Sequence, residues 1–311
     1  MQNYLLLLVA TCNALKVTVV GGSGFVGSRV CEKLISKGAE VTSVSKTGRA
    51  PSAEPWTSSV SWQAVDLLNA DEAAIDSAIG SPDAIISCVG VVDSDKAVLK
   101  QGNGAANVNA FASAKRAGAK RSVYVSVASE VAACEENWLP FAKDEFSAYF
   151  AGKKLAEQAA ADAVNNDATK LCVIKPTFIY GGDAFEIPLP GKFVAPRVSA
   201  AYGRGVEEVL SLGLIQTLAD VLPGLAKVAL RPPVSVEAVA AACVNAALGE
   251  LTTGDATRRA VGTLDGTEAI RAAAGELPPK DLSDGLDRAL DELGNLTEDL
   301  FKWIEKKIEG K

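Results

Sequence analysis

The residue spacing with the clearest chemical meaning is the glycine run Gly21-Gly22-Ser23-Gly24-Phe25-Val26-Gly27, which follows the apolar segment Lys16–Val20. Glycine permits a tight turn and lets the backbone approach a pyrophosphate group closely. A helix that opens directly after such a turn presents free N–H groups and the positive end of its dipole. We therefore predict that the whole run, from Gly21 to Gly27, binds the pyrophosphate of a dinucleotide.

Whether that dinucleotide is NAD or NADP is expected to depend on the residues at the end of the next strand. An acidic residue there would bind the ribose 2′-hydroxyl of NAD, but this chain has Ser45-Lys46-Thr47-Gly48-Arg49 instead. Lys46 and Arg49 could hold a 2′-phosphate, with Ser45 beside them. The sequence therefore favours NADP as the cofactor and leaves NAD as the second choice.

The chain contains no histidine. This absence excludes Ser-His-Asp and Cys-His nucleophiles, His-ligated metals and a histidine pH switch. Acid–base chemistry must come from Tyr, Lys, Asp, Glu or Cys. None of the six cysteines belongs to a CxxC pair, so we expect no metal centre and interpret them as small buried residues of a protein in a reducing compartment.

Composition narrows the class of partner. The formal net charge is −7, and no basic block is present, so we expect no nucleic-acid partner. Hydrophobic residues make up 48 % of the chain and aromatic residues only 6 %, which is typical of a helix-rich α/β protein. No uninterrupted apolar stretch reaches the roughly 18 residues of a transmembrane helix, and none is expected.

Strand and helix patterns alternate along the first two thirds of the chain. Apolar or β-branched runs predict strands at Lys16–Val20, Glu40–Ser45, Val60–Val65, Ala84–Val89, Ser122–Val127 and Leu171–Ile174. Helical patterns lie between or after them, at Ser28–Lys37, Asp71–Ile79, Asn103–Ala117, Phe146–Asn165 and Val236–Leu248. This alternation predicts an α/β fold with a doubly wound parallel sheet of the Rossmann type.

We divide the chain into four regions. Residues 1–15 form an apolar N-terminal arm or a targeting segment, and the sequence leaves both open. Residues 16–182 form the dinucleotide-binding core, and residues 183–265 form a small C-terminal substrate lobe with elements that return to the core. Residues 266–311 form an amphipathic helical tail, whose apolar positions include Leu282, Leu286, Leu290, Leu300, Trp303 and Ile304.

A series of motifs makes residues 16–250 resemble the short-chain dehydrogenase/reductase superfamily, in its extended or atypical form. In chain order they are the glycine turn, Asp66-Leu67, Ser87-Cys88-Val89-Gly90, Asn103-Gly104, Val125-Ser126, Tyr149-xxx-Lys153 and Lys175-Pro176-Thr177-Phe178-Ile179-Tyr180-Gly181. The chain is most similar to the atypical branch that contains the complex I NAD(P)H-binding accessory subunit, the fungal coenzyme Q biosynthesis-associated protein and plant plastid homologues. The resemblance implies an organellar protein of the mitochondrion or plastid.

The same resemblance implies site residues. Asp66 and Leu67 would border the adenine, and Cys88, Val89 and Gly90 would pass beneath the adenosine, while Pro176 and Phe178 would complete the cofactor site. Tyr149 and Lys153 match the catalytic pair. A phenol has a pKa near 10, and a lysine ammonium at i+4 stabilises the phenolate and can bond the nicotinamide ribose.

The third catalytic residue of the family is a Ser or Thr just beyond the fifth strand. The candidates here are Ser126 and Ser129, with Ala128 between them. Two functions follow. One is an NADP-dependent oxidoreductase acting on an apolar substrate such as a quinone or isoprenoid, because Phe185–Leu230 is largely apolar. The alternative is a non-catalytic NADP(H)-binding subunit of an organellar lipid, quinone or electron-transfer complex, associated with that complex or a membrane surface through its C-terminal helices.

Overall fold

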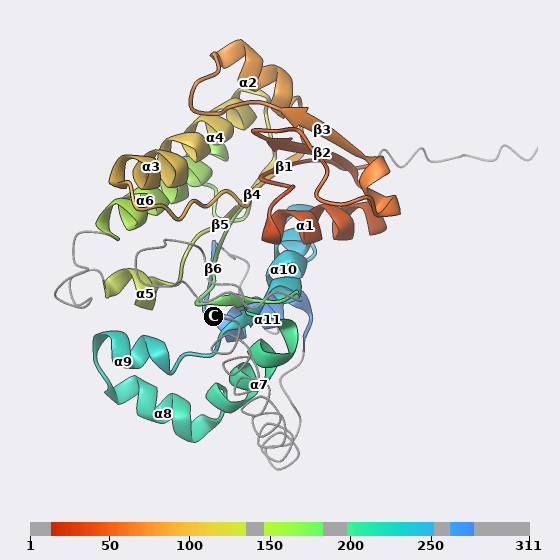
Figure 1. Cartoon of the computed structure of the whole chain (residues 1–311). Helices are drawn as coiled ribbons and strands as arrows, with labels where there is room; N and C mark the ends of the chain where they lie inside the picture. The colour runs from red at the N-terminus through yellow and green to blue at the C-terminus, as the bar shows by residue number, and fades with distance from the viewer. Residues whose placement is uncertain (1–13, 135–145, 183–197, 252–261, 277–311) are drawn as a thin grey trace, which may run out of the picture.

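A seven-stranded sheet forms the centre of the molecule in the computed structural model, which describes residues 14–134, 146–182, 198–251 and 262–276 (Figure 1). All neighbouring strands are parallel, in the order β3-β2-β1-β4-β5-β6-β9. The strands are β1 Lys16–Val20, β2 Glu40–Ser45, β3 Val60–Ala64, β4 Ala84–Ser87, β5 Arg121–Val125, β6 Leu171–Lys175 and β9 Thr263–Asp265. This topology confirms the predicted doubly wound Rossmann fold.

Helices cover both faces of the sheet. Helices α1 (Phe25–Ser36), α10 (Val236–Leu248) and α11 (Thr267–Ala274) pack on one face, and α2 (Glu72–Ile79), α4 (Ala106–Arg116) and α6 (Ser147–Ala163) pack on the other. Because both faces are covered, the central strand β4 is buried on both sides and contains the apolar run Ala84-Ile85-Ile86. Alanine-rich helices such as α10 allow close packing against α1 and β5.

Several element boundaries differ from the sequence prediction. Helix α1 begins at Phe25 rather than Ser28, because Gly24 already occupies the N-cap position. The predicted helix start at Asn103 is wrong. The helix begins at Lys96, where Asp95 caps it by accepting bonds from the N–H groups of Ala97 and Val98. This helix, α3 (Lys96–Lys100), continues through a π-helical turn at Gln101–Ala105 into α4.

The region from Ile179 to Ser235 holds elements that were not predicted from the sequence. They are the two-stranded parallel pair β7 (Ile179–Tyr180) and β8 (Val234–Ser235), and the helices α7 (Ala200–Leu210), α8 (Gly213–Val221) and α9 (Gly224–Ala229). A short helix, α5 (Ser129–Ala133), follows β5, and a 3-10 turn at Pro55–Ser59 precedes β3. Residues 1–13 of the predicted N-terminal arm and residues 277–311 of the predicted amphipathic tail lie outside the described residues.

A buried polar contact fixes α7 to the core. The Tyr180 hydroxyl donates a hydrogen bond of 2.5 Å to Glu207 of α7, and Arg271 of α11 lies 2.8 Å from the other carboxylate oxygen. Glu207 is buried, and this burial raises the pKa of its carboxyl group. Arg271 supplies the positive charge that a buried carboxylate requires.

Within the described ranges, no helix has the length and apolarity needed to cross a membrane.

Candidate dinucleotide and catalytic site

The glycine turn connects β1 to α1 at the carboxyl edge of the sheet. Gly21 has a φ of +81°, a conformation that favours glycine. A Cβ atom at Gly27 would lie 2.2 Å from the carbonyl oxygen of Gly21, so this helix position accepts only glycine. Helix α1 has no side-chain cap and no acidic residue in its first turn. Its N–H groups are thus available to an anion, and this arrangement fits a pyrophosphate.

Phe25 and Arg29 extend the first turn of α1 toward the second half of the chain. The Arg29 guanidinium lies 5.2 Å from the centre of the Phe25 ring, a cation–π contact. The same ring lies near the positions that Cβ atoms would take at Gly181 and Gly182. The glycine turn and the end of β7 therefore meet at one side of the cradle, although sequence reasoning did not single out Arg29.

The end of β2 carries the residues predicted to select the cofactor. Lys46 is exposed and its Nζ lies 3.1 Å from Asp66 Oδ2, so an acid does stand beside the predicted phosphate-binding lysine. Asn69 and the N–H group of Leu68 also donate to this carboxylate and, with Lys46, hold the pKa of Asp66 below its usual value. Arg49 has no polar partner among the described residues. The Ser45 hydroxyl accepts a bond from Gly48 N–H.

Two asparagines hold the chain that leaves β4, the segment that the sequence predicts beneath the adenosine. Asn103 accepts a bond from Val91 N–H and donates to the Val91 carbonyl. Asn107 contacts the Ser87 hydroxyl and donates to the Val89 carbonyl. Sequence reasoning missed Asn107 as a site residue, and the π-helical turn that carries Asn103 is a common feature of functional sites.

Lys153 is the predicted catalytic residue that the structure places most clearly. Its Nζ is buried, donates to the Val125 carbonyl at 3.1 Å, and lies 3.4 Å from the position of a Cβ atom at Gly90. It also lies 5.7 Å from the centre of the Tyr149 ring. Burial lowers the pKa of Lys153 to about 8, while the charges of Cys88 and Glu157 act in the opposite direction.

Tyr149 lies one helical turn before Lys153 on α6, and its ring packs edge-on against Phe150. Burial raises the pKa of Tyr149 to about 12. The phenol therefore holds its proton at neutral pH. In this state it can donate a proton to a developing alkoxide but is a poor base.

The two candidate serines are engaged elsewhere. The Ser126 hydroxyl donates to Glu157 at 2.5 Å, and Glu157 forms an ion pair with Lys175 at 2.9 Å. Lys175 in turn donates to the Ser129 hydroxyl at 3.4 Å. The structure joins both serines into one polar chain with Glu157 and Lys175, which sequence reasoning did not foresee.

A pocket of about 430 Å³ lies along α6 beside this chain. Its apolar lining residues are Val127, Ala132, Phe150 and Ala151. Its charged lining residues are Lys153, Lys154, Glu157 and Lys175. The volume falls in the range of small-molecule sites.

The remaining predicted cofactor residues are Pro176, Phe178 and Leu67. Pro176 and Phe178 lie just beyond β6, where their carbonyl groups accept hydrogen bonds from the N–H groups of Ala128 and Val234 respectively. Leu67 is buried, and its carbonyl accepts a bond from Asn109.

The five cysteines of the described residues, Cys31, Cys88, Cys134, Cys172 and Cys243, are free thiols. The part of the chain that the structure describes contains no group of three or more acidic or cysteine side chains arranged to hold a metal ion.

A parallel sheet in this order, with a glycine turn at the end of β1, defines a dinucleotide-binding protein of the Rossmann type. Residues 17–248 match the NAD dependent epimerase/dehydratase family. The chain belongs to this family. Its predicted resemblance to the extended short-chain dehydrogenases is thereby confirmed.

Three known proteins to which this chain is similar have the following identities and coverages. An uncharacterized chloroplastic protein of Arabidopsis thaliana is 32 % identical over 244 residues, which cover 77 % of this chain and 73 % of the relative. MIOREX complex component 2 of Saccharomyces cerevisiae is 38 % identical over 61 residues, which cover 18 % of this chain and 22 % of that protein. Among solved structures, the Bordetella bronchiseptica enzyme WbmH in complex with NAD+ is 17 % identical with a TM-score of 0.48, and the match covers 76 % of this chain and 73 % of WbmH.

Proposed function

We propose that the protein is an NADP(H)-dependent reductase that acts on an apolar carbonyl compound. The observation that carries this proposal is the position of Lys153. Its buried Nζ lies beside Gly90 and Tyr149, where Lys153 can bind a dinucleotide ribose and a protonated phenol can reach a substrate. A nicotinamide dinucleotide, when bound, supplies the hydride in such a reaction.

The residues of this chain bind the cofactor, hold the proton and line the substrate site. The glycine turn and the free N–H groups of α1 bind the pyrophosphate. Tyr149 holds the proton that the reduced carbonyl oxygen requires, and its raised pKa keeps this proton on the phenol at neutral pH. The apolar lining residues of the pocket, including Val127 and Phe150, support a quinone or isoprenoid-like substrate.

The preference for NADP(H) rests on Lys46 and Arg49. Lys46 has three donors, of which Asp66 takes one, and the Asp66 carboxylate is already bound by its own loop. Lys46, Arg49 and Asp66 together leave one net positive charge at the end of β2. No acid lies on β2 itself in the position that would bind a free 2′-hydroxyl.

The alternative is a non-catalytic NADP(H)-binding subunit of an organellar lipid, quinone or electron-transfer complex. The engagement of Ser126 by Glu157 and of Ser129 by Lys175, with Ala128 between the two serines, favours it, because both candidate serines are bound to residues other than Tyr149. The chloroplastic relative supports an organellar location for either function.

The test is turnover of NADPH with quinone and enone substrates by wild type, Tyr149→Phe and Ser126→Ala. The reductase predicts a loss of at least 100-fold in Tyr149→Phe, with NADPH affinity retained. Ser126→Ala should retain most of the activity, because its hydroxyl is turned toward Glu157. NADPH binding without turnover in wild type would favour the subunit, and unchanged turnover in Tyr149→Phe would exclude the assigned mechanism.

A further inference from the structure

Helix α8 exposes an apolar stripe. Leu214, Leu218 and Val221 have 85 %, 50 % and 74 % of their surfaces exposed. Their spacing of four and three residues places them on one face of the helix. The exposed Thr217 between them is satisfied locally, because its hydroxyl donates to the Gly213 carbonyl at 2.9 Å. This face therefore presents neither a charge nor an unsatisfied side chain to water.

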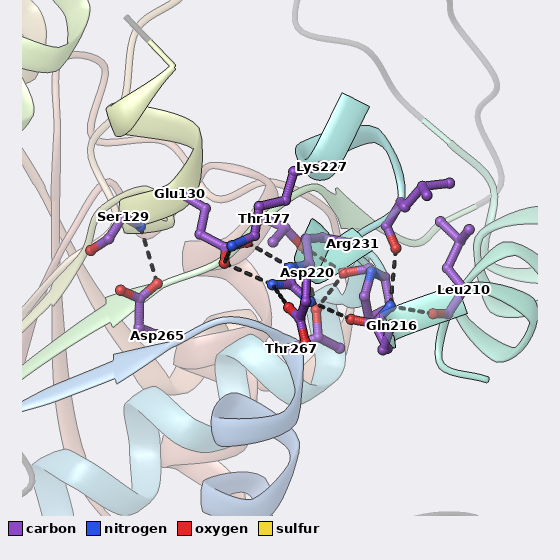
Figure 2. A network of polar contacts seen from close by, with 12 residues as sticks. Ser129, Glu130, Thr177, Leu210, Gln216, Asp220, Lys227, Arg231, Asp265 and Thr267 are labelled. Atoms are coloured by element: carbon purple, nitrogen blue, oxygen red, sulfur yellow. Dashed lines mark hydrogen bonds and ion pairs between the residues drawn. The ribbon is translucent and has the colours of Figure 1, made fainter. Parts of the chain in front are cut away.

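The charged side chains of the α8–α9 hairpin are bound to the body of the protein instead. The hairpin, residues 213–229, carries only two of them, Asp220 and Lys227. Figure 2 shows Asp220 bound to Arg231 at 2.7 Å and Lys227 bound to Glu130 of α5 at 3.0 Å. Arg231 also pairs with Glu130, at 2.6 and 2.8 Å, and with Gln216 at 2.7 Å.

This arrangement reverses the usual polarity of a surface helix, which buries its apolar face and exposes its charges. Asp220 and Lys227 bind the hairpin to the body of the protein, while Leu214, Leu218 and Val221 are exposed to solvent. Figure 1 shows α8 and α9 projecting at the end of the molecule opposite α2. An uncharged apolar stripe complements the apolar acyl region of a bilayer, and it offers no ion pair or hydrogen bond to a polar protein surface.

We propose that the α8–α9 hairpin is a lipid-docking surface, which inserts Leu214, Leu218 and Val221 into the boundary between headgroups and acyl chains. Charge complementarity carries the choice of occupant, because the stripe is uncharged and the acyl region accepts no unpaired charge. Helix α8 has nine residues, far short of the roughly 20 needed to span a bilayer, so it would lie in the plane of the interface. This surface is separate from the dinucleotide site and does not depend on the proposed reductase activity.

The experiment is co-sedimentation of the full chain with vesicles of neutral phosphatidylcholine. We expect reversible binding that 0.5 M salt does not abolish, since no cation on the stripe contributes. The triple variant Leu214→Ser/Leu218→Ser/Val221→Ser should lose roughly tenfold or more in vesicle affinity, because each large apolar side chain contributes substantially to insertion.

A matched triple variant serves as the control. Val92→Ser/Val98→Ser/Leu155→Ser removes three apolar side chains that are also exposed, at 42 %, 41 % and 44 %, but lie outside the hairpin. It should bind vesicles as wild type does. Both variants should show the thermal melting of wild type to within a few degrees, because their side chains pack little in the folded protein.

A second measurement reports insertion directly. Tryptophan emission of Leu218→Trp should shift to the blue on vesicle addition and be quenched by brominated lipid, whereas Leu155→Trp should show neither change. Three results would overturn the proposal: no vesicle binding by the full chain, equal binding by both triple variants, or a dimer in gel filtration that only the hairpin variant disrupts. The second result would assign lipid contact to another part of the chain, and the third would assign the stripe to a second copy.

Discussion

The glycine turn and the network around Arg231 both fix chain segments beyond the carboxyl edge of the sheet, but they do so by opposite means. The turn uses backbone atoms and close packing, with Gly21 and Gly27 in direct contact. The network uses ionic side chains, and Arg231 binds Glu130 across 101 residues of sequence. A tight backbone turn tolerates no added atom, whereas a polar network can lose one member and release only the segment that it holds.

The largest effect should come from Gly27→Ala. Its methyl group would lie 2.2 Å from Gly21 O, so the turn or the helix must move. We expect the free energy of unfolding to fall by roughly 3 kcal/mol and NADPH binding to be lost. Urea unfolding and NADPH fluorescence titration would measure the two effects.

Gly213→Ala is the matched control, because a Cβ atom at Gly213 meets nothing within 4 Å. It should leave both quantities unchanged or raise stability slightly through better helix propensity. Equal stability and NADPH affinity in Gly27→Ala and wild type would show that the turn is not the cradle described above.

Arg231→Ala should have a smaller and more local effect. The Arg231 side chain is largely buried, at 17 % exposed, and its loss leaves Glu130 and Asp220 without their shared partner. We expect a loss of about 2 kcal/mol, which is below the cost of a fully buried pair because Asp220 is 64 % exposed. Hydrogen exchange should accelerate in α8 and α9, with NADPH affinity unchanged.

Arg116→Ala provides the comparison for that variant. Arg116 pairs with Glu72 and Asp76 on the surface, where ion pairs contribute little. It should leave exchange in α8 and α9 as in wild type. If Arg231→Ala weakened NADPH binding as strongly as Gly27→Ala, the two regions would be one cooperative unit and the contrast between them would fail.

The next effect concerns pH. The pKa of Lys153 is lowered to about 8, so the folded protein loses this proton between pH 8 and 10.5 while the unfolded chain keeps it. Since the unfolded state then binds more protons, this group makes stability rise with pH in that window. Affinity for the anionic cofactor should instead fall as pH rises through about 8.

Lys153→Met should show NADPH affinity that is weaker by about tenfold and flat across this range, as measured by titration from pH 6.5 to 9.5. Lys115→Met is the control, because Lys115 is exposed on α4 and does not line the pocket, so this variant should retain the wild-type pH profile. A wild-type profile without any inflection would place Lys153 outside the cofactor site.

The same contrast explains what could be predicted from sequence. The glycine turn, the individual strands of the sheet and the Tyr149–Lys153 pair are local patterns. Each of them lies within a few neighbouring residues of the sequence. The sequence also predicted α10 at its observed bounds, because its alanines follow a capping Ser235. Local propensity and burial pattern determine these features together.

The remaining site features depend on contacts between distant segments. Asp66 reaches Lys46 only because β2 and β3 are neighbours, so no local pattern predicted an acid beside the phosphate-binding lysine. Glu157 accepts the Ser126 hydrogen bond because α6 packs on β5, across 31 residues. Helices α8 and α9 were not predicted because their charged side chains, Asp220 and Lys227, bind the body of the protein and do not mark a solvent-exposed face.

The smallest expected effect concerns the preference for NADPH over NADH, which we assign to Lys46 and Arg49. Equilibrium titration should compare NADPH with NADH for wild type and for Lys46→Ala/Arg49→Ala. We expect wild type to bind NADPH more tightly than it binds NADH. The double variant should lose about fivefold to tenfold in NADPH affinity, as expected for exposed charge contacts, while its NADH affinity stays unchanged. Equal affinities for the two dinucleotides, unaffected by the substitutions, would contradict this assignment.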